Sequence, residues 1–361
     1  MKHFYGALVL PVLLAACSHP LEIIGQGDLL SSTGQRDCLL EDFQSAQTSC
    51  TENMVTHGYQ ETYYGVPRNG WYFHRWANYC GDALDNACAF DVPGSAVEPF
   101  YGATAPPLVA IFRPEVVTGY RSLLIGHSFF NPFALQLPEH ASRAGFVDHD
   151  QTRFFSGGGT GTPEAFWNNA GKRADIQAVL DVGDIELFGM TYHPQYPSMT
   201  GYLNWVRYAL DKNPDTRFFI AMPWTPNATT FSAQQYHNIW AAILPGVCHS
   251  IVDQLRAEFP GVDVFCVPYG QAASELYSLW HAGQLPDVQA ALSSTQDSIF
   301  NDFLGHADDI LVELGSLVWL RAIYGVDLAS YDYEPGYTTD LKGIATEIMD
   351  AHDLAYNNPE L

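Results

Sequence analysis

The sequence predicts an α/β domain with a parallel sheet between two layers of helices, preceded by a small β-rich module held by disulfides. From about residue 114 onward, short apolar runs alternate with longer segments of helical spacing, which is typical of a parallel sheet. Before that point, four cysteines accompany short alternating aromatic segments. The 361-residue chain is 47% hydrophobic, which is enough to bury a large core and a second module.

The N-terminal 17 residues predict a signal peptide and not a part of the fold. Lys2 precedes an apolar run over residues 4–16, which is too short to span a membrane. The run ends in Leu14-Ala15-Ala16-Cys17, which resembles the lipobox of bacterial lipoproteins. This resemblance implies cleavage before Cys17, a lipid on that residue, and a location at the periplasmic or outer-membrane face of the envelope. The alternative is an ordinary secretory signal followed by an incidental cysteine.

The other six cysteines predict disulfides. An even number of cysteines in an exported chain favours disulfide bonds over metal ligands, and no CxxC motif is present. The sequence alone does not choose among the possible connectivities, but the distribution favours the local pairs Cys38–Cys50, Cys80–Cys88 and Cys248–Cys266.

The charge is strongly acidic. The chain has 40 acidic and 16 basic residues and a formal net charge of -24, which would repel the phosphate backbone of a nucleic acid. We therefore exclude nucleic acid as a partner. A solvated acidic surface is favoured over an acidic site for a cationic ligand.

Residues 18–112 predict the β-rich module. The alternation over residues 59–64 indicates a strand, and the turn signal at residues 67–70 is followed by a second strand beginning at Trp71. The order Trp76, Cys80 and then Cys88-Ala89-Phe90 resembles small repeat modules of bacterial surface proteins related to the internalin-type B-repeat. The resemblance implies a structural or binding module and assigns it no chemistry. Residues 102–107 are either the end of this module or a linker.

Residues 113–328 predict the α/β domain, and residues 329–361 a helical C-terminal tail. In a parallel sheet the functional site lies at the carboxyl ends of the strands. The predicted strands are residues 122–126, 153–155, 185–189, 217–221 and, as the last one, 262–266. The predicted helices are residues 133–146, 164–180, 202–212, 234–259 and 307–324.

A candidate nucleophile lies where the first of these strands ends. In Gly126-His127-Ser128-Phe129, the serine falls between the strand and the next helix. The N-terminus of that helix would favour negative charge near the serine oxygen. A serine that merely caps the helix is the alternative for this motif alone.

The order of the motifs resembles the SGNH (GDSL-like) hydrolases over about residues 118–328. Members of that family have Gly-Asp-Ser or Gly-Asn-Ser at the nucleophile, and His127 replaces the acidic or amide residue here. The resemblance implies a flavodoxin-like three-layer α/β/α fold, with Ser128 as the nucleophile whose N–H is also an oxyanion donor.

Two further blocks imply the rest of the oxyanion hole. Ser156-Gly157-Gly158-Gly159-Thr160-Gly161-Thr162 follows the second strand, and the resemblance assigns a donor N–H to Gly158, with Gly157 or Gly159 equally compatible. A phosphate loop would need GxxxxGK[ST], which is absent, and a flexible loop is the other alternative. After the third strand, Thr191 occupies the position of the family's asparagine and implies a hydroxyl donor. His193 and His127 are possible substrate-binding residues, with packing at the strand end as the alternative.

The last block contains the candidate base. Asn301-Asp302-Phe303-Leu304-Gly305-His306 precedes the last long helix, where the family has Asp-x-x-His. The resemblance implies that His306 is the general base and that Asp302 fixes its tautomer, although here the aspartate lies one residue further away than usual. Asp308 and Asp309 are expected to be acidic residues of the helix N-terminus.

Together these resemblances imply hydrolysis of an acyl ester through a Ser128 acyl-enzyme, with no metal or organic cofactor. The predicted location favours acylated polysaccharide as the substrate, with lipid or small acyl esters next, and membrane attachment through the lipid on Cys17. A non-catalytic SGNH-like carbohydrate-binding protein is one alternative, motivated by His127 and Thr191. An envelope scaffold that acts through its N-terminal module is another. The sequence does not give the oligomeric state.

Overall fold

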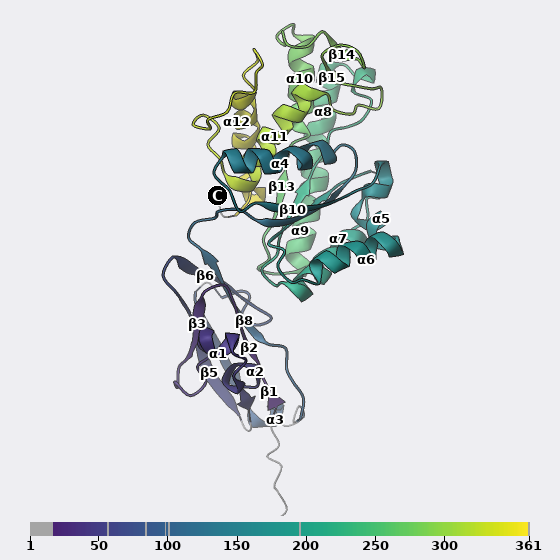
Figure 1. Cartoon of the computed structure of the whole chain (residues 1–361). Helices are drawn as coiled ribbons and strands as arrows, with labels where there is room; N and C mark the ends of the chain where they lie inside the picture. Colours follow the sequence, from purple (N-terminus) through teal and green to yellow (C-terminus); the bar gives the residue numbers. More distant parts are fainter. Residues whose placement is uncertain are drawn as a thin grey trace, which may run out of the picture. The chain divides into compact units, whose positions relative to one another are not determined.

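The computed structural model describes residues 17–55, 58–83, 85–97, 99, 102–194 and 196–359. The chain forms two compact units, of which the first ends at Val116 and the second begins at Val117 (Figure 1). Within the described ranges, no helix combines the length and the apolar composition needed to cross a membrane. The lipobox-like residues 14–16 lie outside these ranges, whereas Cys17 lies inside them and is not disulfide-bonded.

In its described residues, the N-terminal unit consists of short strands and three short α-helices. Strands β2, β8 and β6 form one sheet, in which β2 is parallel and β6 antiparallel to β8. Strands β3, β5 and β7 form an antiparallel sheet, and β1 pairs with β4. The elements are β1 Cys17–Ser18, β2 Leu21–Ile24, β3 Gly27–Ser31, α1 Leu40–Gln44, α2 Thr48–Thr51, β4 Met54–Val55, β5 Tyr59–Pro67, β6 Trp71–Ala77, β7 Ala87–Val92, α3 Gly94–Val97 and β8 Leu108–Pro114.

The alternation predicted for residues 59–64 is present in β5, where every second residue is buried. Tyr63 on β5, Trp76 on β6 and Phe112 on β8 are almost fully buried and form the centre of this core. A core formed by such short strands is small, and two disulfides add to the stability of this unit.

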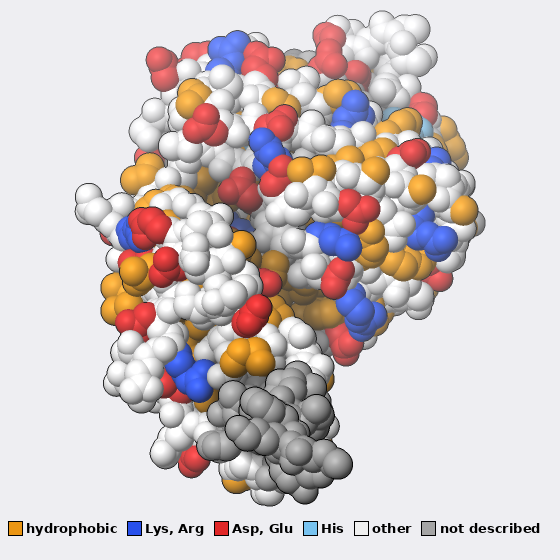
Figure 2. Space-filling view, turned by 60° about the horizontal axis from the view of Figure 1, so that its bottom comes forward, with side chains coloured by type: hydrophobic (Ala, Val, Ile, Leu, Met, Phe, Trp, Pro, Cys, Tyr) orange, Lys and Arg blue, Asp and Glu red, His pale blue; other side chains and the backbone are white. Residues whose placement is uncertain are grey.

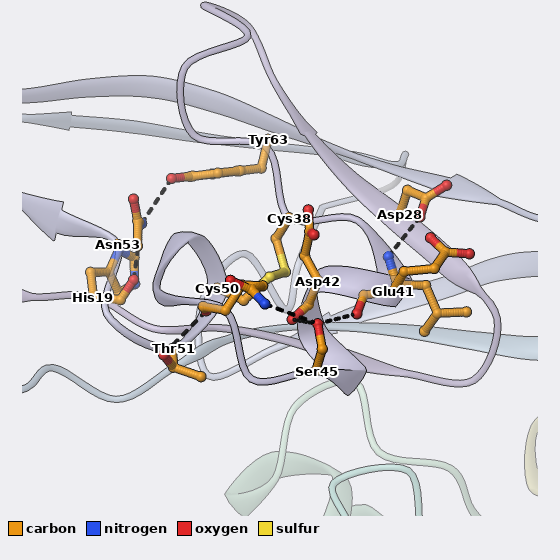
Figure 3. Close-up of a disulfide and its surroundings, with 12 residues drawn as sticks. His19, Asp28, Cys38, Glu41, Asp42, Ser45, Cys50, Thr51, Asn53 and Tyr63 are labelled. Carbon is orange, nitrogen blue, oxygen red and sulfur yellow. Dashed lines mark hydrogen bonds between the residues drawn. A yellow bond between two sulfur atoms is a disulfide. The ribbon is translucent and has the colours of Figure 1, made fainter.

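The three disulfides have the predicted pairing: Cys38–Cys50, Cys80–Cys88 and Cys248–Cys266. The first joins Cys38, two residues before α1, to α2 (Figure 3), and the second joins a loop to β7. The third, in the C-terminal unit, joins a π-helical turn, Leu244–His249, to β13. Disulfides are typical of proteins in the periplasm or outside the cell, which agrees with the predicted export.

The C-terminal unit contains a five-stranded sheet in which all neighbouring strands are parallel. The strand order is β10-β9-β11-β12-β13, which in order along the chain is the 2-1-3-4-5 arrangement of flavodoxin-like sheets. The strands are β9 Arg121–Gly126, β10 Asp150–Phe155, β11 Leu187–Thr191, β12 Arg217–Ala221 and β13 Val264–Val267. The helices are α4 Asn131–Arg143, α5 Pro163–Asn168, α6 Ala170–Leu180, α7 Thr200–Lys212, α8 Ala233–Ile243, α9 Ser250–Glu258, α10 Gln271–His281, α11 Asp309–Tyr324 and α12 Leu341–Asp350.

Helices cover both faces of this sheet, as the sequence predicted (Figure 1). Because side chains alternate along a strand, Leu124 and Phe219 pack with α4, α10, α11 and α12, whereas Leu123 and Phe218 pack with α5, α6, α7 and α9. The two resulting cores place the sheet in the middle of three layers. Its carboxyl-end edge therefore remains the place where loops from several strands meet.

Several predicted elements differ from the observed ones. The predicted helix over residues 164–180 is two helices, because Asn169 leaves the helical conformation and caps α6 by accepting a hydrogen bond from the Lys172 N–H. The strand ending at Cys266 is not the last, since β14 Ala290–Leu292 and β15 Ser298–Phe300 form a small separate sheet. Helix α10 was not predicted.

The limits of the predicted domains also differ from the two units. Strand β8 pairs with β2 and β6, so residues 113–116 belong to the first unit and not to the α/β domain. Within the predicted tail, Leu341 and Ala345 of α12 belong to the same hydrophobic core as α11. The segment after residue 328 therefore completes one helical layer.

The face of the molecule drawn in Figure 2 agrees with the solvated interpretation of the charge. On the face drawn in Figure 2, acidic side chains are scattered among basic and uncharged ones and do not gather in one patch.

Candidate active site

Ser128 lies two residues beyond the end of β9, at the carboxyl edge of the sheet. This is where the strand order reverses, because β9 lies between β10 and β11. The His127 carbonyl accepts hydrogen bonds from the N–H groups of Phe130 and Asn131, which closes a tight turn before α4. Gly126 allows this turn, since a Cβ there would lie 2.3 Å from the Phe130 ring. Ser128 is thus placed on a strand-to-helix turn, as the sequence predicted.

Three of the predicted residues form a hydrogen-bonded chain. The Ser128 Oγ lies 2.8 Å from the His306 Nε2, and the His306 Nδ1 lies 2.6 Å from the Asp302 Oδ2. Ser128 and His306 are 178 residues apart in the sequence, so the fold alone brings them together. A serine, an imidazole and a carboxylate in this order can activate a hydroxyl as a nucleophile.

The loop between Asp302 and His306 is one residue longer than in the family's Asp-x-x-His motif, and its conformation still brings the two side chains together. Gly305 has a φ of +98°, which favours glycine, and its N–H donates to the Asp302 Oδ1 at 2.9 Å. The His306 N–H donates to the same oxygen at 3.1 Å. Partial burial raises the pKa of Asp302, but the hydrogen bonds from the His306 ring and from both N–H groups outweigh it, so the net pKa lies below the ordinary value. Asp302 is therefore an ionised carboxylate at neutral pH.

Phe129, next to the nucleophile, is held from several sides. Its carbonyl accepts a hydrogen bond of 2.9 Å from the Tyr269 hydroxyl. Its ring stacks on Trp224 with 4.6 Å between ring centroids and meets the His306 ring edge to face at 5.3 Å. The Trp224 indole N–H also donates to the Gly305 carbonyl at 2.8 Å. Trp224 thus packs against the nucleophile turn and bonds to the base loop.

His127 contacts protein groups through both ring nitrogens. Its Nε2 lies 2.9 Å from the Tyr192 carbonyl, and its Nδ1 accepts a hydrogen bond of 3.2 Å from the Phe129 N–H. The side chain is only 2% exposed. Burial lowers the pKa of His127 to about 4, so the ring is neutral at neutral pH. The possible substrate-binding role of His127 is therefore not supported, because its polar atoms are already paired and shielded.

His193 follows β11 and is half-buried. Its ring centroid lies 5.3 Å from that of His127, and burial lowers its pKa. This position is compatible with the predicted contact to substrate, which stays a prediction.

The glycine loop has a different close contact from the one predicted. Gly158 begins a short 3-10 helix, Gly158–Gly161, and a Cβ on it would meet nothing within 4 Å. A Cβ on Gly161 would lie 2.2 Å from the Ser156 carbonyl and 2.7 Å from the Gly126 carbonyl. Gly161 is therefore the glycine of this loop whose backbone packs against the nucleophile turn. The sequence instead predicts Gly158 for this role, with Gly157 or Gly159 equally compatible by register.

Thr191 is the last residue of β11 and is fully buried. Its hydroxyl donates a hydrogen bond of 3.2 Å to the Ala221 carbonyl of β12. The predicted oxyanion role of Thr191 is therefore not supported. The error has a simple origin: β11 ends two residues later than predicted, which leaves Thr191 inside the sheet and not in the loop after it.

The sequence reasoning missed Gly161, Trp224 and Tyr269. Trp224 and Tyr269 follow β12 and β13 by two or three residues, at the same edge of the sheet as Ser128. The rule that functional groups gather after parallel strands could have suggested both residues. No local motif marked them, because their contacts with Phe129 exist only in the folded chain.

No group of three or more His, Cys, Asp or Glu residues in the described parts of the chain is arranged to hold a metal ion. No family model and no curated protein matches the chain.

Solved structures that are similar to it include two from bacteria. A DUF4886 family protein from Bacteroides uniformis has 13% identity and a TM-score of 0.44, covering 66% of this chain and 100% of its own. The lipopolysaccharide acetyltransferase periplasmic domain of Salmonella ser. Paratyphi A has 13% identity and a TM-score of 0.29, covering 43% of this chain and 69% of its own. Similarity at this level leaves the function to be inferred from the site residues themselves.

Proposed function

We propose that the C-terminal unit is a serine esterase of the SGNH type that hydrolyses acyl esters. The observation that carries this proposal is the chain from Ser128 through His306 to Asp302, with hydrogen-bond lengths of 2.8 and 2.6 Å. Its place at the reversal point of a 2-1-3-4-5 sheet supports the proposal, because ligands of such sheets bind there. The nucleophile, the base and the acid are all side chains of this chain, so the proposed reaction needs no metal or organic cofactor.

The reaction proceeds in two halves. The Ser128 Oγ attacks the ester carbonyl carbon while the His306 Nε2 takes the hydroxyl proton, and the carbonyl π electrons move to the oxygen. When the tetrahedral intermediate collapses, the C–O bond to the alcohol breaks, and His306 gives its proton to the departing oxygen. Water then attacks the acyl-enzyme, His306 takes one water proton, and release of the acid returns that proton to Ser128. Asp302 holds the tautomer of His306 and stabilises the imidazolium in both halves.

The Ser128 N–H is the main oxyanion donor in this proposal. Within the described residues, nothing accepts a hydrogen bond from it, and it lies just before the N-terminus of α4, whose dipole favours negative charge. A second donor is a main-chain N–H of the glycine loop, which Gly161 packs against the nucleophile turn. Thr191 is not part of this set.

We further propose that the protein acts in the bacterial envelope, attached by a lipid on Cys17. The lipobox-like residues and the three disulfides support this location. Esters accessible there include acylated polysaccharide, which is the substrate we favour, with lipid or small acyl esters next. Mass spectrometry of Cys17 and membrane fractionation of Cys17→Ser test the anchor.

Labelling with a fluorophosphonate tests the esterase. We expect the reagent to modify Ser128, with loss of fluoride as the serine oxygen bonds to phosphorus, and peptide mapping will locate it. Ser128→Ala should abolish both labelling and hydrolysis of aryl acetates. Ser142→Ala, an exposed serine on α4, is the matched control and should retain both. Full hydrolysis by Ser128→Ala would refute the proposal, and an absence of labelling in the folded wild type would favour the non-catalytic binding protein.

A further inference from the structure

The N-terminal unit contains an apolar pocket beside the predicted lipid-bearing residue. The pocket has a volume of about 530 Å³, which is within the range of pockets that bury small ligands. Its walls are almost entirely aliphatic and aromatic, and they include Cys17, Tyr59, Phe90 and Val97. None of the residues of the candidate active site lines it. The pocket is therefore a site without a role in the proposed hydrolysis.

The pocket contains one polar side chain whose hydrogen bonding is incomplete. His19 lines the pocket and is only 5% exposed, and its Nε2 has no hydrogen-bond partner among the described residues. Buried polar atoms without partners are rare in folded proteins, because an unmade hydrogen bond is costly in an apolar environment. The Nε2 is therefore a buried polar atom whose hydrogen-bond partner the described residues do not supply.

A chain of hydrogen bonds indicates that this Nε2 is a donor. The Arg36 guanidinium donates to the Asn53 Oδ1, so the Asn53 amide nitrogen is the atom that donates to the Tyr63 hydroxyl, at 3.0 Å (Figure 3). The Tyr63 hydroxyl lies 2.6 Å from that of Tyr59, which lies 3.3 Å from the His19 Nδ1. Every donor finds an acceptor if each tyrosine donates toward His19. The Nδ1 is then the acceptor, and the proton of the neutral ring is on Nε2.

The predicted attachment point is itself part of a strand. Cys17 is part of β1 and pairs with Val55, and the Ser18 N–H donates to the Ala103 carbonyl at 3.0 Å. No linker therefore separates the proposed lipid from the pocket that Cys17 lines. An acyl chain on the Cys17 amine would start at the pocket wall.

We propose that this pocket holds a fatty acyl chain carried by Cys17, and that the His19 Nε2–H donates to the carbonyl of that acyl group. The hydrocarbon tail fits the apolar walls, and the carbonyl is the acceptor that His19 lacks. This inference rests on the proposed lipidation of Cys17 and not on the proposed esterase activity. In this proposal, the N-terminal unit binds part of the lipid that anchors the protein.

A photocrosslinking experiment on the full chain tests the pocket. Cells that express the wild type are fed a diazirine-bearing fatty acid, which becomes part of the lipids, and the membranes are irradiated. We expect crosslinks between the peptide that starts at Cys17 and the pocket peptide around Phe90 and Val97. Ala96→Trp should fill the pocket and abolish these crosslinks. Ala89→Trp is the matched control, since Ala89 is exposed on β7 and does not line the pocket.

The masses separate the possible outcomes. A pocket peptide crosslinked to a free phospholipid, and not to the Cys17 peptide, would mean that the chain comes from another source and would overturn the proposal. Crosslinks that persist in Ala96→Trp, or none in the wild type, would overturn it as well. If Cys17 carries no acyl group, the anchor itself is refuted and the proposal fails with it, whereas fluorophosphonate labelling at Ser128 would be unaffected.

A separate observation concerns His127, which lies directly before the proposed nucleophile. The Tyr192 carbonyl can only accept, so the His127 Nε2 carries the proton, while the Nδ1 accepts from the Phe129 N–H. One neutral tautomer satisfies both bonds at once. His127 thereby ties the turn around Ser128 to the segment that follows β11.

We propose that His127 is a positioning residue for Ser128, and that its bond to the Phe129 N–H is the one that matters for turnover. This proposal rests on the proposed esterase. In His127→Asn, the side-chain oxygen can replace the Nδ1 as acceptor but is too short to reach Tyr192. In His127→Gln, the longer amide can reach Tyr192 but loses the acceptor next to Phe129. The two variants therefore separate the two bonds.

Steady-state kinetics with an aryl acetate shows which of the two His127 hydrogen bonds matters for turnover. We expect His127→Ala to lower kcat about 10- to 100-fold with little change in KM, since a misplaced nucleophile affects chemistry more than binding. His127→Asn should restore most of kcat and His127→Gln should not. Unchanged kcat in His127→Ala, or no rescue by His127→Asn while that variant is folded, would overturn the proposal. Loss of activity in Ser128→Ala shows in each case that the esterase itself stands.

Discussion

The two sides of the candidate active site are built differently. On the nucleophile side, Ser128 lies between the buried side chains of His127, Phe129 and Phe130, and its turn begins directly at a central strand. On the base side, the side chains of His306 and Asp302 are 29% and 47% exposed, on a loop between β15 and α11. The nucleophile position is thus part of the core, whereas the base position depends on the hydrogen bonds of one loop, including the one that Trp224 donates to the Gly305 carbonyl. Changes on the first side should affect stability and activity together, and changes on the second side activity alone.

The largest expected effect is on the base side. His306→Ala should lower kcat by about 10⁴-fold or more, because the nucleophile and base act as one unit. The unfolding temperature should change little, since the ring is partly exposed and bonds only to Ser128 and Asp302. Hydrolysis of an aryl acetate and thermal unfolding by circular dichroism measure the two effects. Full activity in this variant would mean that another base is used, and His193 would be the next candidate.

Asp302→Ala comes next. It should retain roughly 10- to 100-fold more activity than His306→Ala, because water can partly replace a residue that fixes a tautomer. The carboxylate also accepts from the Gly305 and His306 N–H groups, so part of the loss will come from a loosened loop. Asp302→Asn keeps an acceptor for these groups but not the negative charge. Equal hydrogen-exchange protection of the Gly305 and His306 N–H groups in Asp302→Ala and the wild type would contradict the loop argument.

Gly161→Ala tests the nucleophile side. The added methyl would lie 2.2 Å from the Ser156 carbonyl, so backbone must move beside the turn that carries Ser128. We expect a loss of about 1–3 kcal/mol in the free energy of unfolding. The same shift should lower kcat by up to about 100-fold, since small misplacements of reacting groups are costly. Urea denaturation and kinetics report the two effects.

The matched control for this variant is Gly157→Ala. Gly157 has a φ of -69°, and a Cβ there would meet nothing within 4 Å. It should change neither stability nor turnover. Equal effects in Gly157→Ala and Gly161→Ala would show that the loop as a whole, and not the close contact, is what matters.

The sequence predicted the layers of the fold because its signals there are local. Strand residues 217–221 match β12 residue for residue, since a fully buried strand gives a continuous apolar run. The cysteine pairs were also correct, because each joins segments that are close in sequence. Helix α10 was not predicted. Its buried face includes Ala272, Ala273 and Ser274, and such small residues give only a weak apolar pattern in the sequence.

The site was predictable only where a motif existed. Ser128, His306 and Asp302 came from blocks with a recognisable order, and the structure brings their side chains together. Thr191 was assigned from a block that departs from the family, and an error of two residues in the strand end changed its environment from loop to sheet. Which glycine packs against the turn depends on contacts between β9 and the loop after β10, and no local pattern encodes such contacts.

The smallest expected effect concerns the exposed rim of the base loop. Phe303, which is 64% exposed, lies between Asp302 and His306 and makes little contact with the core. Surface changes of this kind alter the free energy of unfolding by only about 0.5 kcal/mol or less. If the rim contacts the substrate, Phe303→Ser should raise KM for hydrophobic esters by a factor of about 2–10 and should leave kcat unchanged. This factor corresponds to the binding free energy lost when one or two methylene groups are no longer buried. For acetyl esters of small alcohols KM should not change, because they offer too little apolar surface. A drop in kcat, or a marked loss of stability, would show that the Phe303 side chain stabilises the base loop, as buried side chains stabilise the nucleophile turn. The two sides of the site would then not differ in the way described above.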